Sequence, residues 1–594
     1  MAKTILGIIL LAVPFLCLAF FKDKKIGSVY IIFFSFLFHT ALAFFTQFFG
    51  VFNYGVVLAI TLIFEIILLI FWHQNRRSSV LVTRDFLKKI DWVLLLVAVI
   101  AFLSLYQVHY NYTGKINFAT DTEVSYHEVK NMKYEYPYFS DEWYAVLLIE
   151  NSIDSGHLPL AGFGGRHFLN LEIFFHSFVS EIMLILGLNV LTKYTLISIF
   201  FNILIVVLAY LFLRISKVSQ LSSAVSSLLI LYIASGANLP GIWNFMPVHM
   251  GIIFCLIGFC FMAAGKTLPA TIVGLPVIIF YAPLFIFYGI ALLTFGFPTK
   301  VASWRDCDEP VKMRFALLSG LLLLVLPFIY IVLMVSPFGD LVSSKLLYTS
   351  FYGDKMNVNF NFYNVIPFFA VVFGLFGLGY IYKKLKWFLA VLILGFSFWI
   401  FYSFTTTRFL IEYERVVFFT SILVCIASGF GLQFIGDRFE KFNRYIKYLE
   451  AVVFVAFLVF ALFYTRAENW KSFVVRDITG SSLAYYPKAP ANNYLIKEDL
   501  EIFIAIRNKN FLSIPWKGTV IGVATKNNPL SIKQGTISSN NNVLSDFLLS
   551  DCKGKEIIAE QEKIDYVYLS GFKCPQFKEI QKSPENLILY EFSP

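Results

Sequence analysis

The chain has 594 residues, of which 58% are hydrophobic and only 14% charged, and its mean hydropathy is +0.72. A water-soluble core could not bury this much apolar surface, so the composition excludes a soluble globular protein and predicts a chain solvated by a bilayer. The formal net charge of +10 does not indicate nucleic-acid binding. The basic residues cluster beside apolar runs, as the positive-inside rule expects.

Apolar runs of roughly 17 to 23 residues predict membrane-spanning helices along residues 1–465. Twelve are plain in the sequence, at 4–21, 28–49, 54–72, 91–109, 191–213, 221–237, 248–264, 315–336, 363–382, 387–404, 415–436 and 449–465. The apolar stretch 266–300 is interrupted by prolines and predicts two short helices that form a hairpin through the membrane. The predicted fold class is therefore an α-helical polytopic membrane protein with about fourteen helices.

Basic clusters such as 22–25, 76–89 and 438–447 indicate which ends of these helices are cytoplasmic. Their parity requires that the apolar segment around Glu172, His176 and Glu181 does not fully cross the membrane. Each carboxylate at the bilayer centre would cost roughly 2.5–3.5 kcal/mol, so we expect an interfacial or re-entrant helix there. This orientation predicts a large outer loop at 110–190 and an extracytoplasmic tail at 466–594, in a plasma or inner membrane.

The polar tail predicts a small α/β domain. A helical pattern at 496–508 is followed by strand-like runs at 519–525, 564–569 and 587–592. Cys552 and Cys574 lie in this tail. A disulfide between them fits an extracytoplasmic location, and two free thiols are the alternative.

The densest polar motif of the outer loop is Tyr136-Pro-Tyr-Phe-Ser-Asp-Glu-Trp-Tyr, followed by an amphipathic stretch that ends at Gly156. Ser140 suits a helix N-cap, and Asp141 and Glu142 suit the positive end of a first turn. Neighbouring helical residues point about 100° apart, so both acids cannot face one small ligand. We expect Asp141 to face it; the alternative is that both acids only stabilise the helix end.

This acidic pair, the following Ile153-Asp-Ser-Gly-His-Leu-Pro, the many apolar runs and the polar C-terminal tail together resemble the GT-C superfamily of membrane glycosyltransferases. The chain has four apolar runs, 4–21, 28–49, 54–72 and 91–109, before the acidic loop, where that family usually has one. The resemblance implies that Asp141 is a catalytic base or a ligand of a divalent metal, Mg²⁺ or Mn²⁺, supported by Glu142. It also implies a polyprenyl-phosphate-linked sugar donor and a saccharide, lipid or protein acceptor.

Cations that could hold the donor phosphate occur in two places. Arg166 and His167 follow a glycine-rich turn of the outer loop, which could equally be an ordinary surface turn. Arg408, Glu412 and Arg415 lie at the outer mouth of two late helices, where their charges could instead pair only with one another.

Trp243 and His249 could stack on or hydrogen-bond to a sugar, although interface anchoring explains the tryptophan as well. Glu172 and His176 have the spacing of metal ligands on a helix, but a hydrogen-bonded pair on a wet helix face is the more ordinary interpretation.

His39 and Glu65 are ionisable groups within apolar runs and are expected to bond to neighbouring helices. The sequence thus predicts a glycosyltransferase that uses a polyprenyl-phosphate-linked sugar on the outer face of the membrane. The alternatives are a transporter or flippase, or a polymerase, of lipid-linked saccharides. Helices interrupted at matching positions of two halves would favour a transporter, and the sequence shows such an interruption only at 269–298.

Overall fold

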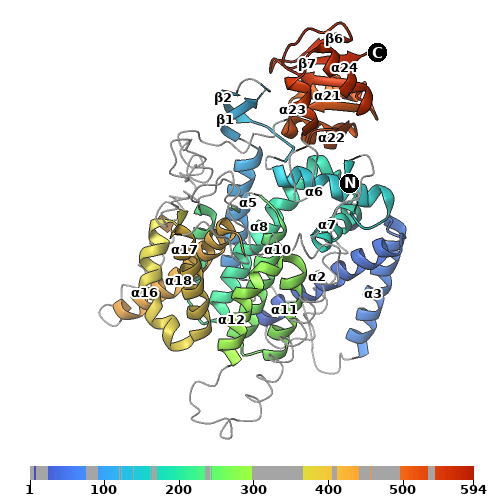
Figure 1. The fold of residues 1–594 in the computed structure, drawn as a ribbon. Helices are drawn as coiled ribbons and strands as arrows, with labels where there is room; N and C mark the ends of the chain where they lie inside the picture. Colours follow the sequence, from blue (N-terminus) through green and yellow to red (C-terminus); the bar gives the residue numbers. More distant parts are fainter. Residues whose placement is uncertain are drawn as a thin grey trace.

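The computed structural model describes residues 24–74, 91–110, 112–119, 121, 124–137, 140–160, 162–163, 170, 172–233, 241–242, 244–296, 365–404, 411–440, 495–532 and 542–593, and isolated positions at 4, 6, 7, 452, 455 and 456. Figure 1 shows a helical domain with the C-terminal domain at one end of it. The predicted helices at 4–21, 315–336 and 449–465, and the predicted domain boundary near 465, lie wholly or mostly outside the described residues.

The other predicted membrane helices are confirmed as helices, and their observed ends lie within a few residues of the predicted ends. They are α2 (Lys24–Phe48), α3 (Tyr54–Gln74), α5 (Trp92–Tyr110), α8 (Val190–Ile215), α9 (Gln220–Leu229) with the 3₁₀ turn η4 (Ile230–Tyr232), α10 (Pro247–Ala263), α16 (Phe368–Lys384), α17 (Lys386–Phe404) and α18 (Tyr413–Glu440). Among the described residues, four helical runs are long and apolar enough to cross a membrane, at Ile26–Phe48, Val190–Ile215, Thr267–Gly296 and Tyr413–Arg438.

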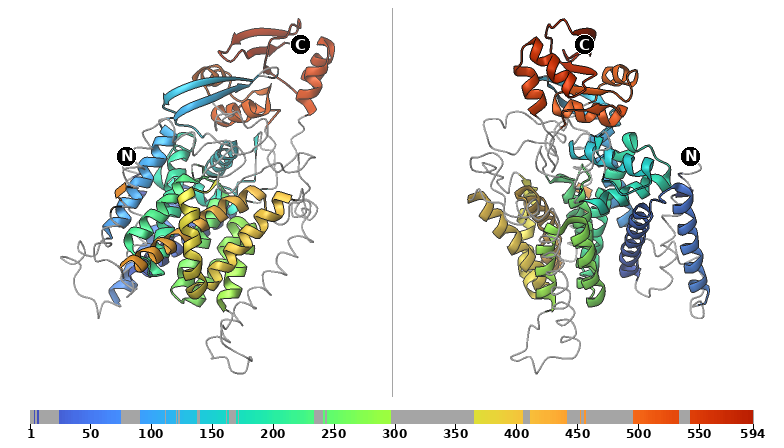
Figure 2. Two further views of the ribbon diagram at one scale, coloured as in Figure 1. Left: turned by 90° about the vertical axis from the view of Figure 1, so that its left-hand side faces the viewer. Right: turned by 45° about the vertical axis from the view of Figure 1, so that its right-hand side comes forward.

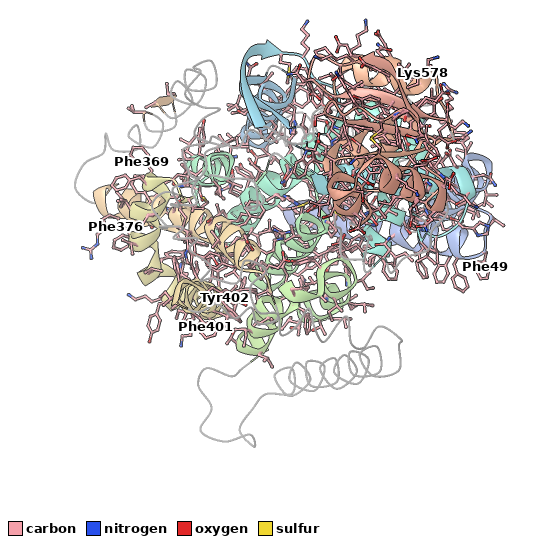
Figure 3. The ribbon with its side chains drawn as sticks, turned by 45° about the horizontal axis from the view of Figure 1, so that its top comes forward. Phe49, Phe369, Phe376, Phe401, Tyr402 and Lys578 are labelled. Carbon is pink, nitrogen blue, oxygen red and sulfur yellow. A yellow bond between two sulfur atoms is a disulfide. The ribbon has the colours of Figure 1, made fainter. Side chains whose placement is uncertain are left out.

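The outer surface of the helical domain is strongly apolar. Large hydrophobic side chains are exposed along α2, α3, α5, α16 and α17. Phe49, Phe369, Phe376 and Phe401 lie at the rim of this domain in Figure 3, and Phe49 is 70% exposed. Water would disfavour such a surface and lipid would cover it, which agrees with a membrane protein.

The run Thr267–Gly296 is not one straight helix, because α11 (Thr267–Tyr281) ends at the 3₁₀ turn η5 (Ala282–Leu284) before α12 (Phe285–Gly296) begins. The hydroxyl of Tyr288 on α12 donates to the carbonyl of Ala270 on α11. In a straight helix these residues would be about 27 Å apart, so the chain folds back on itself. The predicted pair of short helices that form a hairpin is therefore confirmed.

Two glycines allow α16 and α18 to cross at very short range. A Cβ atom on Gly431 would lie 1.7 Å from the carbonyl oxygen of Phe373, and one on Gly377 would lie 2.4 Å from that of Ala427. Side chains larger than hydrogen would force the two helices apart, so glycine is required at this crossing.

The outer loop contains more structure than its sequence suggested. An antiparallel pair, β1 (Tyr112–Ala119) and β2 (Val124–Met132), precedes two helices, α6 (Ser140–Ser155) and α7 (Ile173–Leu186). The helix predicted over 140–156 is α6, and Gly156 ends it with φ +74°. With 14 residues, α7 is about 21 Å long, too short to cross a hydrocarbon core of about 30 Å. This agrees with the expected interfacial or re-entrant helix.

The C-terminal domain is an α/β fold around a five-stranded sheet of order β4-β3-β5-β7-β6. Strands β4, β3 and β5 are parallel, and β7 and β6 complete the sheet with antiparallel pairing. The elements are α21 (Lys497–Ile504), β3 (Asn510–Ser513), α22 (Pro515–Thr525), β4 (Asn528–Pro529), α23 (Asn542–Leu549), α24 (Cys552–Gln561), β5 (Tyr566–Leu569), β6 (Phe577–Lys582) and β7 (Ile588–Phe592). The predicted helix at 496–508 and the last two predicted strands are confirmed.

The predicted strand at 519–525 is wrong, because this segment belongs to helix α22. Pro515 starts the helix at its first position, where its missing N–H costs nothing. The Val- and Ile-rich run resembled a buried strand because α22 is buried on nearly all sides.

Cys552 and Cys574 form a disulfide. Of the two alternatives for these residues, a bridge or two free thiols, the structure shows the bridge.

Several hydrogen bonds and an ion pair among the described residues dock the C-terminal domain on the outer loop. Asp121, after β1, accepts hydrogen bonds from the backbone N–H and the hydroxyl of Ser570, at 2.7 and 2.5 Å. Tyr134 accepts from the N–H of Leu495 at 3.0 Å, and Asp154 on α6 pairs with Lys526, the residue after α22, at 2.6 Å. Both views in Figure 2 show this domain at the end of the helical domain where β1 and β2 lie. Helix α6 is thereby held between the two domains.

Candidate functional site

The two acids of α6 face different surroundings. Asp141 is exposed, whereas Glu142 is only 2% exposed. An Oε1 atom of Glu142 accepts a hydrogen bond from the backbone N–H of Phe245 at 3.0 Å. Burial of Trp143 and Val146 on the inner face of α6 fixes this orientation. Asp141 is thus the acid that a ligand from solvent would meet first, and Glu142 ties α6 to the segment before α10.

That segment, which ends at Met246, is held by a tyrosine of α8 and a histidine of α10. The hydroxyl of Tyr194 on α8 donates to the carbonyl of Phe245 at 2.8 Å. His249 is fully buried; its Nε2 lies 2.9 Å from the carbonyl of Gly241, and its Nδ1 lies 3.1 Å from the N–H of Met246. A carbonyl only accepts, so Nε2 carries the hydrogen and Nδ1 accepts. Both ring nitrogens of His249 are therefore used to shape the loop.

Arg415 approaches the acids of α6 from the start of α18. Its Nε lies 3.2 Å from Oε2 of Glu412, and its side chain is hydrogen-bonded to the hydroxyl of Tyr281, beside the turn of the helix hairpin. The negative charges of Glu412, Glu414 and Asp141 all act on the guanidinium. The fold thus brings an exposed carboxylate and a guanidinium from distant parts of the chain into electrostatic range of each other.

Glu172 belongs to the same neighbourhood, because its charge acts on Tyr144, Tyr194 and Tyr281. Burial, with a smaller contribution from the charge of Glu172, raises the pKa of Tyr144 to about 12. The site therefore draws on α6, the start of α7, the start of α8, the hairpin turn and the start of α18.

Of the predicted site residues, the structure brings together Asp141, Glu142, Glu412 and Arg415, with His249 beside them. The charge of Arg415 also acts on His249. The remaining predicted site residues, Arg166, His167, Trp243 and Arg408, lie outside the described residues. The sequence did not point to Tyr194 or Tyr281; the only signal is a tyrosine near the end of an apolar helix, which many membrane helices share.

The expected pair of Glu172 and His176 on a wet helix face is wrong. His176 is buried, and its Nδ1 lies 3.1 Å from the side-chain nitrogen of Asn170. Glu172, one turn earlier, is exposed at the helix start. The helix therefore turns the histidine into the core and leaves the carboxylate at the site.

The described residues do not fit a divalent metal. Within this part of the chain, no three His, Cys, Asp or Glu side chains converge in a way that could hold a metal ion. Asp141 and Glu142 point in different directions, so they do not form a ligand pair.

A second cluster of ionisable side chains lies inside the helical domain. Nδ1 of His39 on α2 is 2.9 Å from Oε1 of Glu181 on α7, and both side chains are buried. The charge of His39 also acts on Glu65 of α3. The expectation that His39 bonds to a neighbouring helix is confirmed.

The other end of α6 carries a carboxylate with an unusual environment. Burial raises the pKa of Glu150 to about 7, while the nearby positive charge of Lys526 opposes the shift. Glu150 is thus poised between its charged and neutral forms near neutral pH, at the place where the C-terminal domain meets α6.

No protein-family model and no curated protein sequence matches the chain. It is similar to solved structures of the oligosaccharyltransferase of Archaeoglobus fulgidus. For AglB in complex with an inhibitory peptide and a dolichol-phosphate, identity is 14%, coverage is 80% of this chain and 69% of that chain, and the TM-score is 0.43. For the apo form, identity is 13%, coverage is 82% of this chain and 70% of that chain, and the TM-score is 0.47. For the complex with Zn and sulfate, identity is 14%, coverage is 84% of this chain and 73% of that chain, and the TM-score is 0.43. At TM-scores below 0.5 these likenesses do not establish a shared fold.

Proposed function

We propose that the protein is a membrane glycosyltransferase that moves a sugar from a polyprenyl-phosphate-linked donor to an acceptor on the outer face of a cell membrane. The observation that carries this proposal is that the exposed carboxylate of Asp141 on α6 lies within electrostatic range of the guanidinium of Arg415 at the start of α18. Transfer from a lipid phosphate needs a base for the acceptor hydroxyl and a cation for the departing phosphate. The carboxylate and the guanidinium have these chemistries.

In this proposal Asp141 takes the proton of the acceptor hydroxyl as its oxygen attacks the anomeric carbon. The bond from that carbon to the phosphate oxygen breaks, and its electron pair leaves with the polyprenyl phosphate. Attack opposite the leaving group inverts the anomeric configuration. Arg415 stabilises the phosphate, and Arg166, His167 and Arg408 remain predicted contributors.

Glu142 has a positioning role in this scheme, because its carboxylate is buried against the N–H of Phe245. It fixes the start of α6 relative to the loop before α10, and so fixes the direction of Asp141.

The disulfide between Cys552 and Cys574 supports an outer location of the C-terminal domain, since disulfides persist mainly in oxidising compartments. Its docking on the outer loop supports the same side for β1, β2 and α6. The site would then face the compartment in which polyprenyl-linked sugars are used.

One observation favours the alternative of a transporter of lipid-linked saccharides. The buried pair of His39 and Glu181, with Glu65 nearby, has the character of a proton-coupled pathway. One ion pair does not by itself define such a pathway, so transfer remains the proposed function.

Proteoliposomes containing the full chain and a labelled polyprenyl-phosphate hexose distinguish these functions. A glycosyltransferase releases polyprenyl phosphate and labels an acceptor supplied as a mixture of oligosaccharides, peptides and lipids. A transporter moves the intact donor between leaflets and releases no polyprenyl phosphate. Movement of intact donor without release would overturn the proposal.

A further inference from the structure

A group of buried polar atoms beside Glu142 has no hydrogen-bond partner among the described residues. They are both side-chain amide atoms of Asn244, Oδ1 of Asn202 and Oγ of Ser198. All three side chains are fully buried. A buried polar group left without a partner costs about 1–3 kcal/mol, so native proteins contain few of them.

These atoms belong to one place in the fold. The side-chain nitrogen of Asn202 donates to the carbonyl of Ser198 at 2.9 Å and to the carbonyl of Asn244 at 2.8 Å. Tyr194, Ser198 and Asn202 are each one helical turn apart and share a face of α8. Since Tyr194 bonds to the carbonyl of Phe245, this face runs along segment 244–245. The N–H of Phe245 in turn binds Glu142.

The chemistry of the group selects a class of ligand. It offers amide N–H donors and carbonyl and hydroxyl acceptors, and none of the three side chains is charged. A phosphate would need cations or a set of N–H donors, and a lipid tail would need an apolar surface. Sugar hydroxyls each donate and accept, so they match a mixed and neutral set.

We propose that Ser198, Asn202 and Asn244 bind the hydroxyl groups of the transferred sugar. The inference rests on the proposed function and adds the part of the site that recognises the sugar rather than the lipid phosphate. The indole N–H of Trp143, the residue after Glu142, is also buried without a partner among the described residues and provides a further donor on α6.

The test measures equilibrium binding of lipids to the full chain in nanodiscs. The probes are polyprenyl-phosphate mannose, polyprenyl-phosphate glucose and polyprenyl phosphate without a sugar. The variants are Ser198→Ala and Asn244→Ala. Ser223→Ala is the matched control. Ser223 lies on α9 and is as buried as Ser198, but its hydroxyl already donates to the carbonyl of Ser219.

Wild-type protein should bind at least one sugar-bearing lipid more tightly than bare polyprenyl phosphate. Ser198→Ala and Asn244→Ala should each weaken that binding about twofold to tenfold, the range for one neutral hydrogen bond. Binding of bare polyprenyl phosphate should not change, and the control should behave like wild type.

Two failures are distinguishable. If bare polyprenyl phosphate binds but the variants leave the preference for sugar-bearing lipids intact, the buried atoms hold only water and this inference is overturned. If neither bare nor sugar-bearing lipid binds to wild-type protein, the proposed function itself fails, and the sugar site with it.

Discussion

The buried ionic group of the C-terminal domain provides a sharp test of its packing. Nζ of Lys517 on α22 lies 2.6 Å from Oδ2 of Asp499 and 2.5 Å from Oε2 of Glu585, and all three side chains are at most 6% exposed. Tyr568 donates to the other oxygen of Asp499 at 2.5 Å. One lysine therefore holds two carboxylates together in the core.

Substitution of Lys517 with methionine keeps much of the side-chain volume and removes the cation that bonds to both carboxylates. Breaking a buried ion pair from one side costs about 3–5 kcal/mol, because the partner charge stays buried and uncompensated. Each 1.36 kcal/mol is a factor of ten, so local opening of the domain should become about 100-fold to 5,000-fold more frequent.

The stability lost in Lys517→Met should depend on pH in a definite direction. Burial raises the pKa of Glu585 in the folded chain from 4.5 to about 7. The folded state thus keeps a proton that the unfolded state releases above pH 4.5, so stability falls as pH rises from 4.5 through 7. Without Lys517, whose charge lowers the pKa of Glu585, the penalty at pH 8 should exceed that at pH 6.

Hydrogen exchange of the full-length protein measures this opening locally, in peptides that cover β3 and β5. Lys517→Met should lose protection at pH 8 by the factor above and regain part of it at pH 6. Glu585→Gln should flatten the pH dependence. Equal protection in wild type and Lys517→Met, or a loss independent of pH, would refute this reasoning.

Two further predictions concern the helix crossing and the disulfide. Gly431→Val should separate α16 from α18 and lower the melting temperature of the purified protein. The control Gly379→Val on α16 should lower the melting temperature far less, since no atom of the described residues lies within 4 Å of the point that its Cβ would occupy. Similar losses from both variants would contradict the close crossing of α16 and α18. Cys552→Ser should lower the free energy of unfolding of the C-terminal domain by about 2–4 kcal/mol, because it opens a loop with a sequence separation of 22. The loss should appear as faster proteolysis of the tail under non-reducing conditions. Unchanged proteolysis would argue against the bridge.

Sequence periodicity predicted much of the helical domain, because membrane helices follow from the length of apolar runs alone. It failed at α22, where complete burial removes the polar face that separates a helix from a buried strand. It also missed β1 and β2, which pair with each other and show no strong local pattern in the sequence.

The candidate site was predictable only in part. The helical geometry of α6 predicted that Asp141 and Glu142 diverge, and the structure agrees. The partner of Glu142 is the N–H of Phe245, far away in the sequence, and no local pattern indicates it. The same applies to the contact of His39 with Glu181. Long-range contacts of this kind are fixed by tertiary packing.

The most direct test of the proposed transfer compares Asp141→Asn with Asp154→Asn in purified full-length protein. Both residues are exposed aspartates of α6, but only Asp141 lies at the candidate site, whereas Asp154 pairs with Lys526. Loss of a general base should slow release of polyprenyl phosphate from a labelled donor about 100-fold to 10,000-fold in Asp141→Asn, with Asp154→Asn close to wild type. Release by Asp141→Asn at the wild-type rate would contradict the proposed role of this acid.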